Sequence, residues 1–66
     1  MQIKVNGNIH ELGGPVTVQA LAEQLGLNPK LVAVERNLAI VPKSAYDSVM
    51  VSEGDTIEIV RFIGGG

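Results

Sequence analysis

The sequence begins with a pattern that strongly favours a β-hairpin. Residues 1–5 alternate apolar and polar side chains, and a period of two is typical of a strand with one buried face. Asn6-Gly7 follows directly, and this pair is the strongest short hairpin signal because both residues tolerate a positive φ angle. Residues 8–12 should therefore return as a second strand, which Gly13-Gly14-Pro15 ends.

A single helix is predicted after this hairpin. Thr17 is a suitable N-cap residue, because its hydroxyl can accept a hydrogen bond from an unpaired N–H group of the first turn. Apolar side chains then recur at the spacing of one helix face, at Val18, Leu21, Ala22 and Leu25. Gly26 stands where a glycine commonly ends a helix, and Pro29 prevents its continuation. We therefore expect one helix at about Val18–Leu25.

The rest of the chain consists of short apolar runs separated by turn residues. A turn is expected at Arg36-Asn37, with Asn37 in the left-handed region, and another at residues 52–55. Strands are indicated at Leu31–Val34, Leu38–Val41, Val49–Val51 and Thr56–Ile63, with an irregular or single-turn segment at Lys43–Ser48. Strands grouped around one helix predict an α+β domain of the β-grasp type, a mixed sheet of four to five strands with the helix packed across one face. We assign residues 1–63 to this domain and residues 64–66 to a flexible C-terminal glycine tail.

The small size of the chain limits the chemistry that it can perform alone. A domain of 66 residues has a thin core and little room for a cleft lined by convergent polar groups. The sequence contains no cysteine, and its one histidine, His10, has no other ligand residue at metal-binding spacing. We therefore expect no catalytic residues, no metal site and no enzyme activity.

The charge pattern argues against two classes of partner. Seven acidic and five basic residues give a formal net charge of −2, which disfavours nonspecific binding to nucleic acid. The sequence shows no basic amphipathic helix, no apolar run long enough to span a bilayer, and no signal or transit pattern at its start. We expect a cytoplasmic chain that binds neither nucleic acid nor membrane and is monomeric when free.

The glycines Gly64-Gly65-Gly66 are the strongest candidate for a functional segment. Glycine has no Cβ atom, so such a segment can enter a narrow channel that any side chain would block. A terminal glycyl carboxylate is unhindered, but it is ionised at neutral pH and becomes reactive only after activation, for example as an acyl-adenylate. The alternative is a frayed end without a role. Since no rival site occurs elsewhere in the sequence, we expect the chemistry at this end.

The predicted final strand has one face for the core and one for a partner. Ile57 and Ile59 share one side, so Val60 and Phe62 lie on the open sheet face if the isoleucines face the helix. An apolar pair beside the tail suits a partner surface. The candidate interface residues are Val60, Arg61, Phe62 and Ile63. The alternative is that the segment Lys43–Ser48 covers the pair.

Several segments together resemble one known family. They are Val34-Glu35-Arg36-Asn37, Ile40-Val41-Pro42, Glu53-Gly54-Asp55, and Ile57-Glu58-Ile59-Val60 leading into Phe62-Ile63-Gly64-Gly65-Gly66. This combination resembles the sulfur carrier proteins of the thiamine pathway, commonly called ThiS, which have a ubiquitin-like β-grasp fold. The resemblance spans essentially the whole chain, including its ending. It is more specific than a terminal Gly-Gly alone, which many ubiquitin-like proteins share.

This resemblance implies a reaction cycle on Gly66. An adenylating enzyme related to the ubiquitin-activating enzymes would use ATP and magnesium to convert the Gly66 carboxylate to an acyl-adenylate. A sulfur donor, supplied from cysteine through a desulfurase, would convert it to a thiocarboxylate. Thiazole synthase would then accept the sulfur into the thiazole ring of thiamine. Gly64 and Gly65 would form the slim approach, and no cofactor would stay bound to the carrier itself.

Three other functions are compatible with the same residues. The small subunit of molybdopterin synthase shares the fold, the tail and the chemistry, and a ubiquitin-like modifier shares the ending. A passive β-grasp binding module for nucleotide or RNA would leave the tail without a role, although the chain lacks an aromatic platform for RNA. A gain of mass at the C-terminus in the presence of the adenylating enzyme would separate a carrier from such a module.

Overall fold

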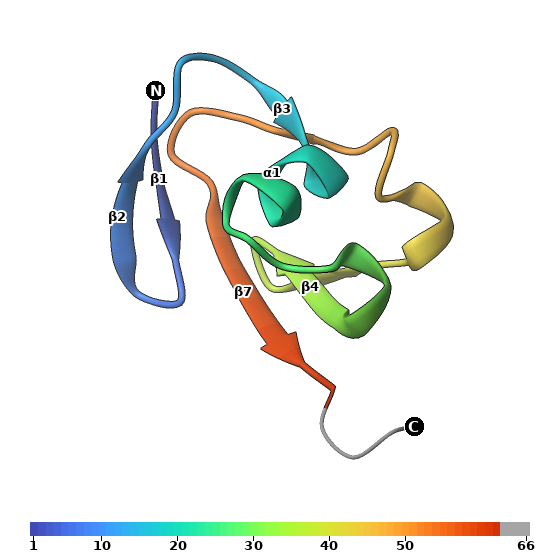
Figure 1. The fold of residues 1–66 in the computed structure, drawn as a ribbon. Helices are drawn as coiled ribbons and strands as arrows, with labels where there is room; N and C mark the ends of the chain where they lie inside the picture. The colour runs from blue at the N-terminus through green and yellow to red at the C-terminus, as the bar shows by residue number, and fades with distance from the viewer. Residues whose placement is uncertain (63–66) are drawn as a thin grey trace.

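A mixed sheet of five strands forms the centre of the fold. In the computed structural model, which describes residues 1–62, the strands follow the order β2-β1-β7-β4-β5. Their bounds are Gln2–Val5 for β1, Asn8–Glu11 for β2, Val32–Arg36 for β4, Ala39–Val41 for β5 and Thr56–Arg61 for β7. The helix α1, Val18–Gln24, crosses one face of this sheet (Figure 1). The predicted α+β β-grasp fold is thereby confirmed.

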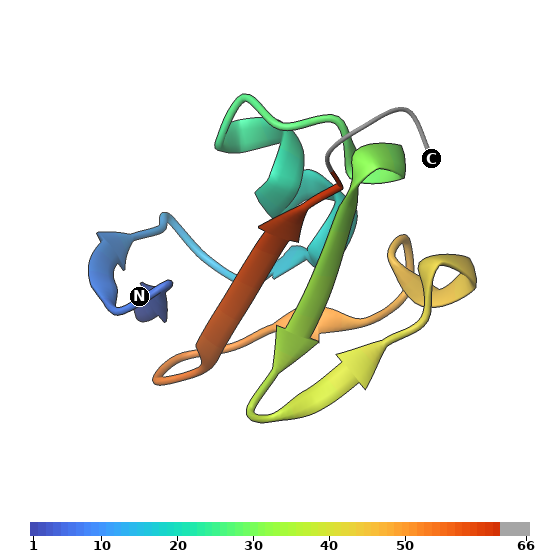
Figure 2. The same ribbon diagram turned by 90° about the horizontal axis from the view of Figure 1, so that it is seen from below.

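The last strand, β7, lies in the middle of the sheet. It pairs in parallel with β1 and antiparallel with β4, where the register runs from Val32 opposite Arg61 to Arg36 opposite Ile57. Figure 2 shows β7 and β4 side by side, with β5 beyond β4. The end of β7 is therefore held by the main chain of β4.

The predicted N-terminal hairpin is also confirmed. β1 and β2 pair antiparallel around Asn6 and Gly7, whose φ angles are 49° and 83°. The Asn6 side chain has a second role, because its Nδ2 donates to the carbonyl of Ile59 at 3.1 Å and its Oδ1 accepts from the N–H of Ile59 at 2.8 Å. Asn6 therefore extends the pairing of the hairpin with β7 beyond the end of β1.

The helix forms where its sequence signals predict. The Thr17 hydroxyl accepts a hydrogen bond from the N–H of Ala20 at 3.0 Å, and α1 ends before Gly26, which has a φ angle of 76°. The apolar face of α1 and the inner face of the sheet make one core. Its largest fully buried side chains are Ile3, Val18, Leu21, Val32, Val34, Val51 and Ile57. Within residues 1–62, no helix has the length and apolar character needed to cross a membrane.

Two strands begin later than their apolar runs suggest. Leu31 belongs to the 3-10 helix η1 (Pro29–Leu31), which the Asn28 side chain starts by accepting from the N–H of Lys30 at 2.9 Å. Leu38 belongs to a two-residue turn with Asn37, because their φ angles are 70° and 51°. The prediction that strands start at Leu31 and Leu38 is therefore wrong. Both residues are apolar, so the sequence pattern does not distinguish them from the strands that follow.

A second, two-stranded sheet supports the start of the helix. It pairs β3 (Val16–Thr17), which the sequence pattern did not indicate, with β6 (Met50–Val51), inside the strand predicted at Val49–Val51. The predicted single-turn segment is the 3-10 helix η2 (Lys43–Ala45). The loop after η2 accepts a hydrogen bond from the first turn of α1, because the N–H of Gln19 donates to the carbonyl of Tyr46 at 2.8 Å.

Candidate functional site

The structure places the residues that lead into the glycine segment. Val60 and Phe62 are 63% and 54% exposed, whereas Ile57 and Ile59 are buried in the core. The predicted division of the two faces of β7 is therefore confirmed. Arg61 is exposed and pairs with Val32, which places it on the opposite face from Val60. The other predicted site residues, Ile63, Gly64, Gly65 and Gly66, lie outside the described residues.

Phe62 is held in place by two neighbouring segments. Its N–H donates to the carbonyl of Leu31 at 2.9 Å, which extends the contact between β4 and β7 by one residue. The Nζ atom of Lys43 lies 4.5 Å from the centre of the Phe62 ring and donates to the carbonyl of Lys30. A cation over an exposed ring stabilises the contact by about 0.5–1 kcal/mol. The segment from Lys43 therefore orients the ring but leaves more than half of Phe62 exposed.

The apolar surface around Phe62 is larger than the sequence suggested. Val60 lies opposite Ala33, which is also exposed, and Ile40 on the neighbouring strand is 78% exposed. We call Ala33, Ile40, Val60 and Phe62 the open-face patch. Sequence reasoning missed Ala33 and Ile40, because each lies in a continuous apolar run, Leu31–Val34 or Leu38–Val41, in which no alternation with polar residues marks the outer face. In the structure, Val34 pairs with Val41 in the core and Glu35 pairs with Ile40, so Ile40 points outward.

Two acidic side chains interrupt the open-face patch. Glu35 lies opposite Glu58 on β7 and opposite Ile40 on β5. Like charges in directly opposed positions destabilise a sheet, and within residues 1–62 neither carboxylate has a basic group within 4.0 Å. A partner surface that offers a basic group beside apolar side chains would relieve this repulsion.

The most buried charge of the described chain has a structural role. Asp55 is only 7% exposed and accepts hydrogen bonds from the N–H of Ser52 at 2.7 Å, from Nε of Arg36 at 2.7 Å and from Nδ2 of Asn37 at 3.0 Å. Burial by itself raises the pKa of Asp55, but these hydrogen bonds and the Arg36 charge outweigh it and hold the pKa below its ordinary value of 3.8.

The hydrogen bonds of Asp55 join two of the segments that carry the family resemblance. The Asn37 side chain also accepts from the N–H of Thr56 at 2.9 Å, so it joins the β4–β5 turn to the start of β7. Arg36 and Asn37 come from one segment and Asp55 from the other. Their side chains point to each other rather than to a partner, and we infer that both segments are needed for the turns.

A shallow pocket lies beside the end of β7 on the helix side of the sheet. It has a volume of about 260 Å³, and His10, Leu25, Leu27 and Arg61 are among the residues that line it. His10 is half-buried in its wall. Within residues 1–62, no group of three or more His, Asp and Glu side chains could hold a metal ion. The pocket shows no arrangement for nucleophilic or acid–base catalysis.

Known proteins resemble this chain in sequence and in fold. Residues 3–66 match the ThiS family. The chain is 52% identical over all 66 residues to part of a thiazole synthase from Paramagnetospirillum magneticum, and it spans only 20% of the length of that protein. A sulfur carrier protein ThiS from Bacillus subtilis is 46% identical over 50 residues, which make up 76% of each chain. The crystal structure of thiamine biosynthesis protein ThiS from Geobacter metallireducens has a TM-score of 0.86 and 32% identity, with both chains covered completely.

Proposed function

We propose, because the chain belongs to the ThiS family, that it carries sulfur for thiazole formation in thiamine biosynthesis as a thiocarboxylate on Gly66. The observation that carries the proposal is the placement of the open-face patch. The central strand β7 ends beside this exposed apolar surface, and three glycines follow Ile63 directly in the sequence. The domain would thus dock through the patch while its glycines enter a partner.

The proposed cycle starts from a carboxylate that is unreactive until it is activated. An oxygen of the Gly66 carboxylate attacks the α-phosphorus of ATP on an adenylating enzyme, and pyrophosphate leaves. The persulfide that a desulfurase forms from cysteine then attacks the acyl carbon through its outer sulfur, and AMP leaves with the bridging oxygen. A thiol reduces the resulting acyl disulfide, which releases the thiocarboxylate and forms a disulfide on the sulfur donor. ATP and magnesium belong to the adenylating enzyme, and the carrier supplies only its carboxylate. A cytoplasmic location is part of the same proposal, since ATP is available there.

Thiazole synthase is the acceptor in this proposal. The relative from Paramagnetospirillum magneticum is named a thiazole synthase, and one fifth of its length is similar to the whole of this chain. A carrier-like segment within an acceptor enzyme supports a pairing of the two activities here as well. The thiocarboxylate sulfur is a better nucleophile than a carboxylate oxygen, and Gly64 and Gly65 are slim enough to deliver it into another active site.

The candidate interface residues fit the docking step in different ways. Val60 and Phe62 supply apolar area on the open face, Arg61 supplies charge on the other face, and Ile63 follows them in sequence. A Phe62→Asp variant should raise the KM for adenylation by about tenfold, because it places a charge in an apolar contact. An Ile9→Asp variant is the matched control, since Ile9 is 58% exposed on β2 outside the patch.

Circular dichroism separates docking from folding in this experiment. Phe62→Asp should keep the wild-type spectrum, because its ring is more than half exposed. If Phe62→Asp unfolds, its ring belongs to the core, and if both variants raise KM equally, the patch is not the docking surface.

The decisive test of the function is the intact mass of the chain that ends at Gly66. Incubation with the adenylating enzyme, ATP, magnesium, cysteine, the desulfurase and a thiol reductant should add the mass of one oxygen-to-sulfur exchange. A chain that lacks Gly66 is the control and should gain no such mass. An unchanged mass of the full chain would rule out the sulfur carrier function. Transfer of the sulfur to thiazole synthase, rather than to the molybdopterin synthase large subunit, checks the pathway.

A further inference from the structure

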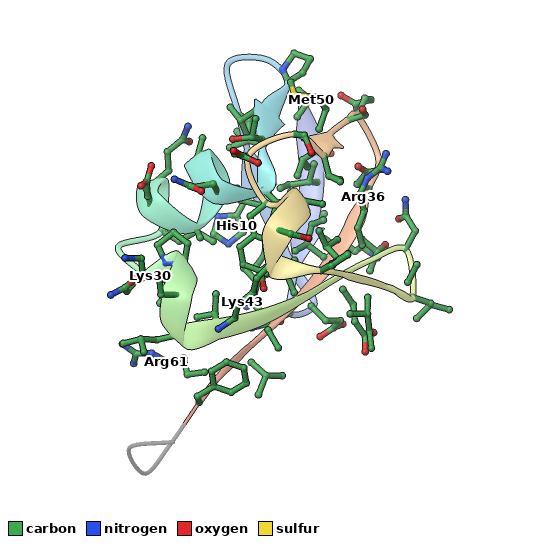
Figure 3. The ribbon with its side chains drawn as sticks, turned by 90° about the vertical axis from the view of Figure 1, so that its right-hand side faces the viewer. His10, Lys30, Arg36, Lys43, Met50 and Arg61 are labelled. Atoms are coloured by element: carbon green, nitrogen blue, oxygen red, sulfur yellow. The ribbon has the colours of Figure 1, made fainter. Side chains whose placement is uncertain are left out.

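Three of the five basic residues of the chain gather around the end of β7. Arg61 is the last residue of β7, Lys30 belongs to η1, and Lys43 belongs to η2. Figure 3 shows these three side chains around the end of the strand. We call Lys30, Lys43 and Arg61 the basic collar.

Contacts between the three segments hold the basic collar together. The Nζ atom of Lys43 donates to the carbonyl of Lys30, and the next residue, Leu31, accepts from the N–H of Phe62. Arg61 lies opposite Val32 in the β4–β7 register, directly after η1. The three collar residues therefore come from the segments η1, η2 and β7, which meet beside the last described residue, Phe62.

The charges of the basic collar are not balanced by neighbouring acids. Within residues 1–62, no carboxylate lies within 4.0 Å of any of its three cationic groups, since the ion pairs there involve Met1 and Arg36 instead. The collar carries a formal charge of +3. Two basic and seven acidic residues remain in the rest of the chain, which leaves a formal charge of −5 there. The chain is therefore polarised between the basic collar and the remaining residues, although Glu35 and Glu58 lie nearby on the open face.

A polarised molecule of this kind suits an acidic protein surface better than nucleic acid. A phosphate backbone carries negative charge along its whole length, so it would attract the three collar cations but repel the −5 charge on the rest of the domain. A local acidic surface attracts the collar over a small area, and a basic group beside it would meet Glu35 and Glu58 in the open-face patch. Such charge patterns orient a protein before contact and raise its association rate.

We infer that the basic collar docks on an acidic surface of the adenylating enzyme, at the mouth of the site that receives the glycine segment. This inference rests on the proposed function, because it assigns the partner that the function requires. The collar would direct the end of β7 toward the enzyme first, and the open-face patch would then make the apolar contact. The collar thus acts on the rate of association, and the patch acts on the lifetime of the complex.

The test compares two double variants that have the same net charge. Lys30→Gln with Arg61→Gln neutralises two collar cations and changes the formal net charge from −2 to −4. Gln19→Glu with Gln24→Glu produces the same net charge on exposed positions of α1. Lys43 is left unchanged, because it also contacts the Phe62 ring. Association rates with the purified adenylating enzyme are measured by stopped flow at about 20 mM and about 500 mM salt.

The collar variant should associate at least about tenfold more slowly than the wild type at low salt, and the helix variant should stay within about twofold. The difference should largely vanish at high salt. Equal slowing of both variants would overturn the inference, since net charge alone would then explain it, and so would a collar variant that associates at the wild-type rate. The mass assay separates the two proposals. If the wild type binds the enzyme faster than the collar variant but gains no sulfur, the proposed function is refuted and the docking role of the collar still holds.

Discussion

Replacement of Asp55 by asparagine should remove about half of the stability of this domain at neutral pH. A domain of 66 residues has an unfolding free energy of about 6 kcal/mol. Asp55 accepts three hydrogen bonds while 7% exposed, and a buried bond to a charged group contributes about 1.5–3 kcal/mol. Asparagine keeps one acceptor oxygen but turns an N–H₂ group toward the remaining donors. The bond from Arg36 contributes less than this range, because the Arg36 side chain is 34% exposed to solvent. We therefore expect a total loss of about 3 kcal/mol in the unfolding free energy.

Urea denaturation followed by circular dichroism measures this loss. The midpoint should fall without a change in the slope of the transition, because the surface exposed on unfolding stays the same. In a thermal experiment, a loss of about 3 kcal/mol corresponds to a decrease in Tm of roughly 12–24 °C for a domain of this size.

The pH dependence gives a second, independent signature. The pKa of Asp55 is lower in the folded protein than its ordinary value of 3.8. The stabilisation by the carboxylate is therefore fully present above that ordinary value and is lost as the pH falls through the folded pKa. Asp55→Asn has no such group to titrate. The difference in unfolding free energy between the wild type and Asp55→Asn should therefore become smaller from neutral pH to about pH 3.

Asp47→Asn provides the matched control, because Asp47 is exposed. It should change the unfolding free energy by less than about 0.5 kcal/mol. A loss of less than about 1 kcal/mol for Asp55→Asn at neutral pH, or an equal loss at about pH 3, would show that the Asp55 carboxylate does not stabilise the fold in this way.

Three smaller changes test local features by the same urea assay. Leu38→Gly should stabilise the domain by about 0.5–1 kcal/mol, because Leu38 is 86% exposed with a φ angle of 70° that glycine adopts without strain; a loss of stability would show that the leucine makes a compensating contact. Thr17→Ala should lower the unfolding free energy by about 1 kcal/mol, because it removes the cap to Ala20. Thr17→Ser keeps the hydroxyl and should stay close to the wild type; an equal loss in both variants would show that the methyl group, and not the cap, stabilises the fold. Tyr46→Phe should cost about 1 kcal/mol, since it removes the hydrogen bond of 2.8 Å to the buried carbonyl of Val32; an unchanged midpoint would mean that the carbonyl finds another donor.

The parts of the fold that the sequence predicted depend on neighbouring residues. Asn6-Gly7 needs only two backbone conformations to form its turn, and Thr17 caps a helix whose apolar face follows within one turn. These signals act over a few residues, so they can be recognised without knowledge of the tertiary arrangement. The two faces of β7 were also predicted, because successive side chains of a strand point to opposite sides. Once Ile57 and Ile59 are assigned to the helix side, Val60 must lie on the other side.

The parts that were missed depend on residues far apart in the sequence. Leu38 is a poor residue for a left-handed turn, and it is held there because Asn37 binds Asp55 and Thr56, which lie 18 and 19 positions away. The outward face of Ile40 was missed because its apolar run does not alternate with polar residues, so the face follows only from the pairing of β5 with β4. The basic collar was missed for the same reason, since Lys30, Lys43 and Arg61 come together only through the fold.

The central position of β7 also determines how the domain responds to a mechanical load. A pull along the axis of β7 would act on a strand that lies between β1 and β4. Its backbone bonds to both neighbours lie across that axis, so they are loaded together in shear rather than opened one after another, as the bonds of an edge strand would be when peeled away. The domain can therefore transmit a pull on its end without unravelling from that end.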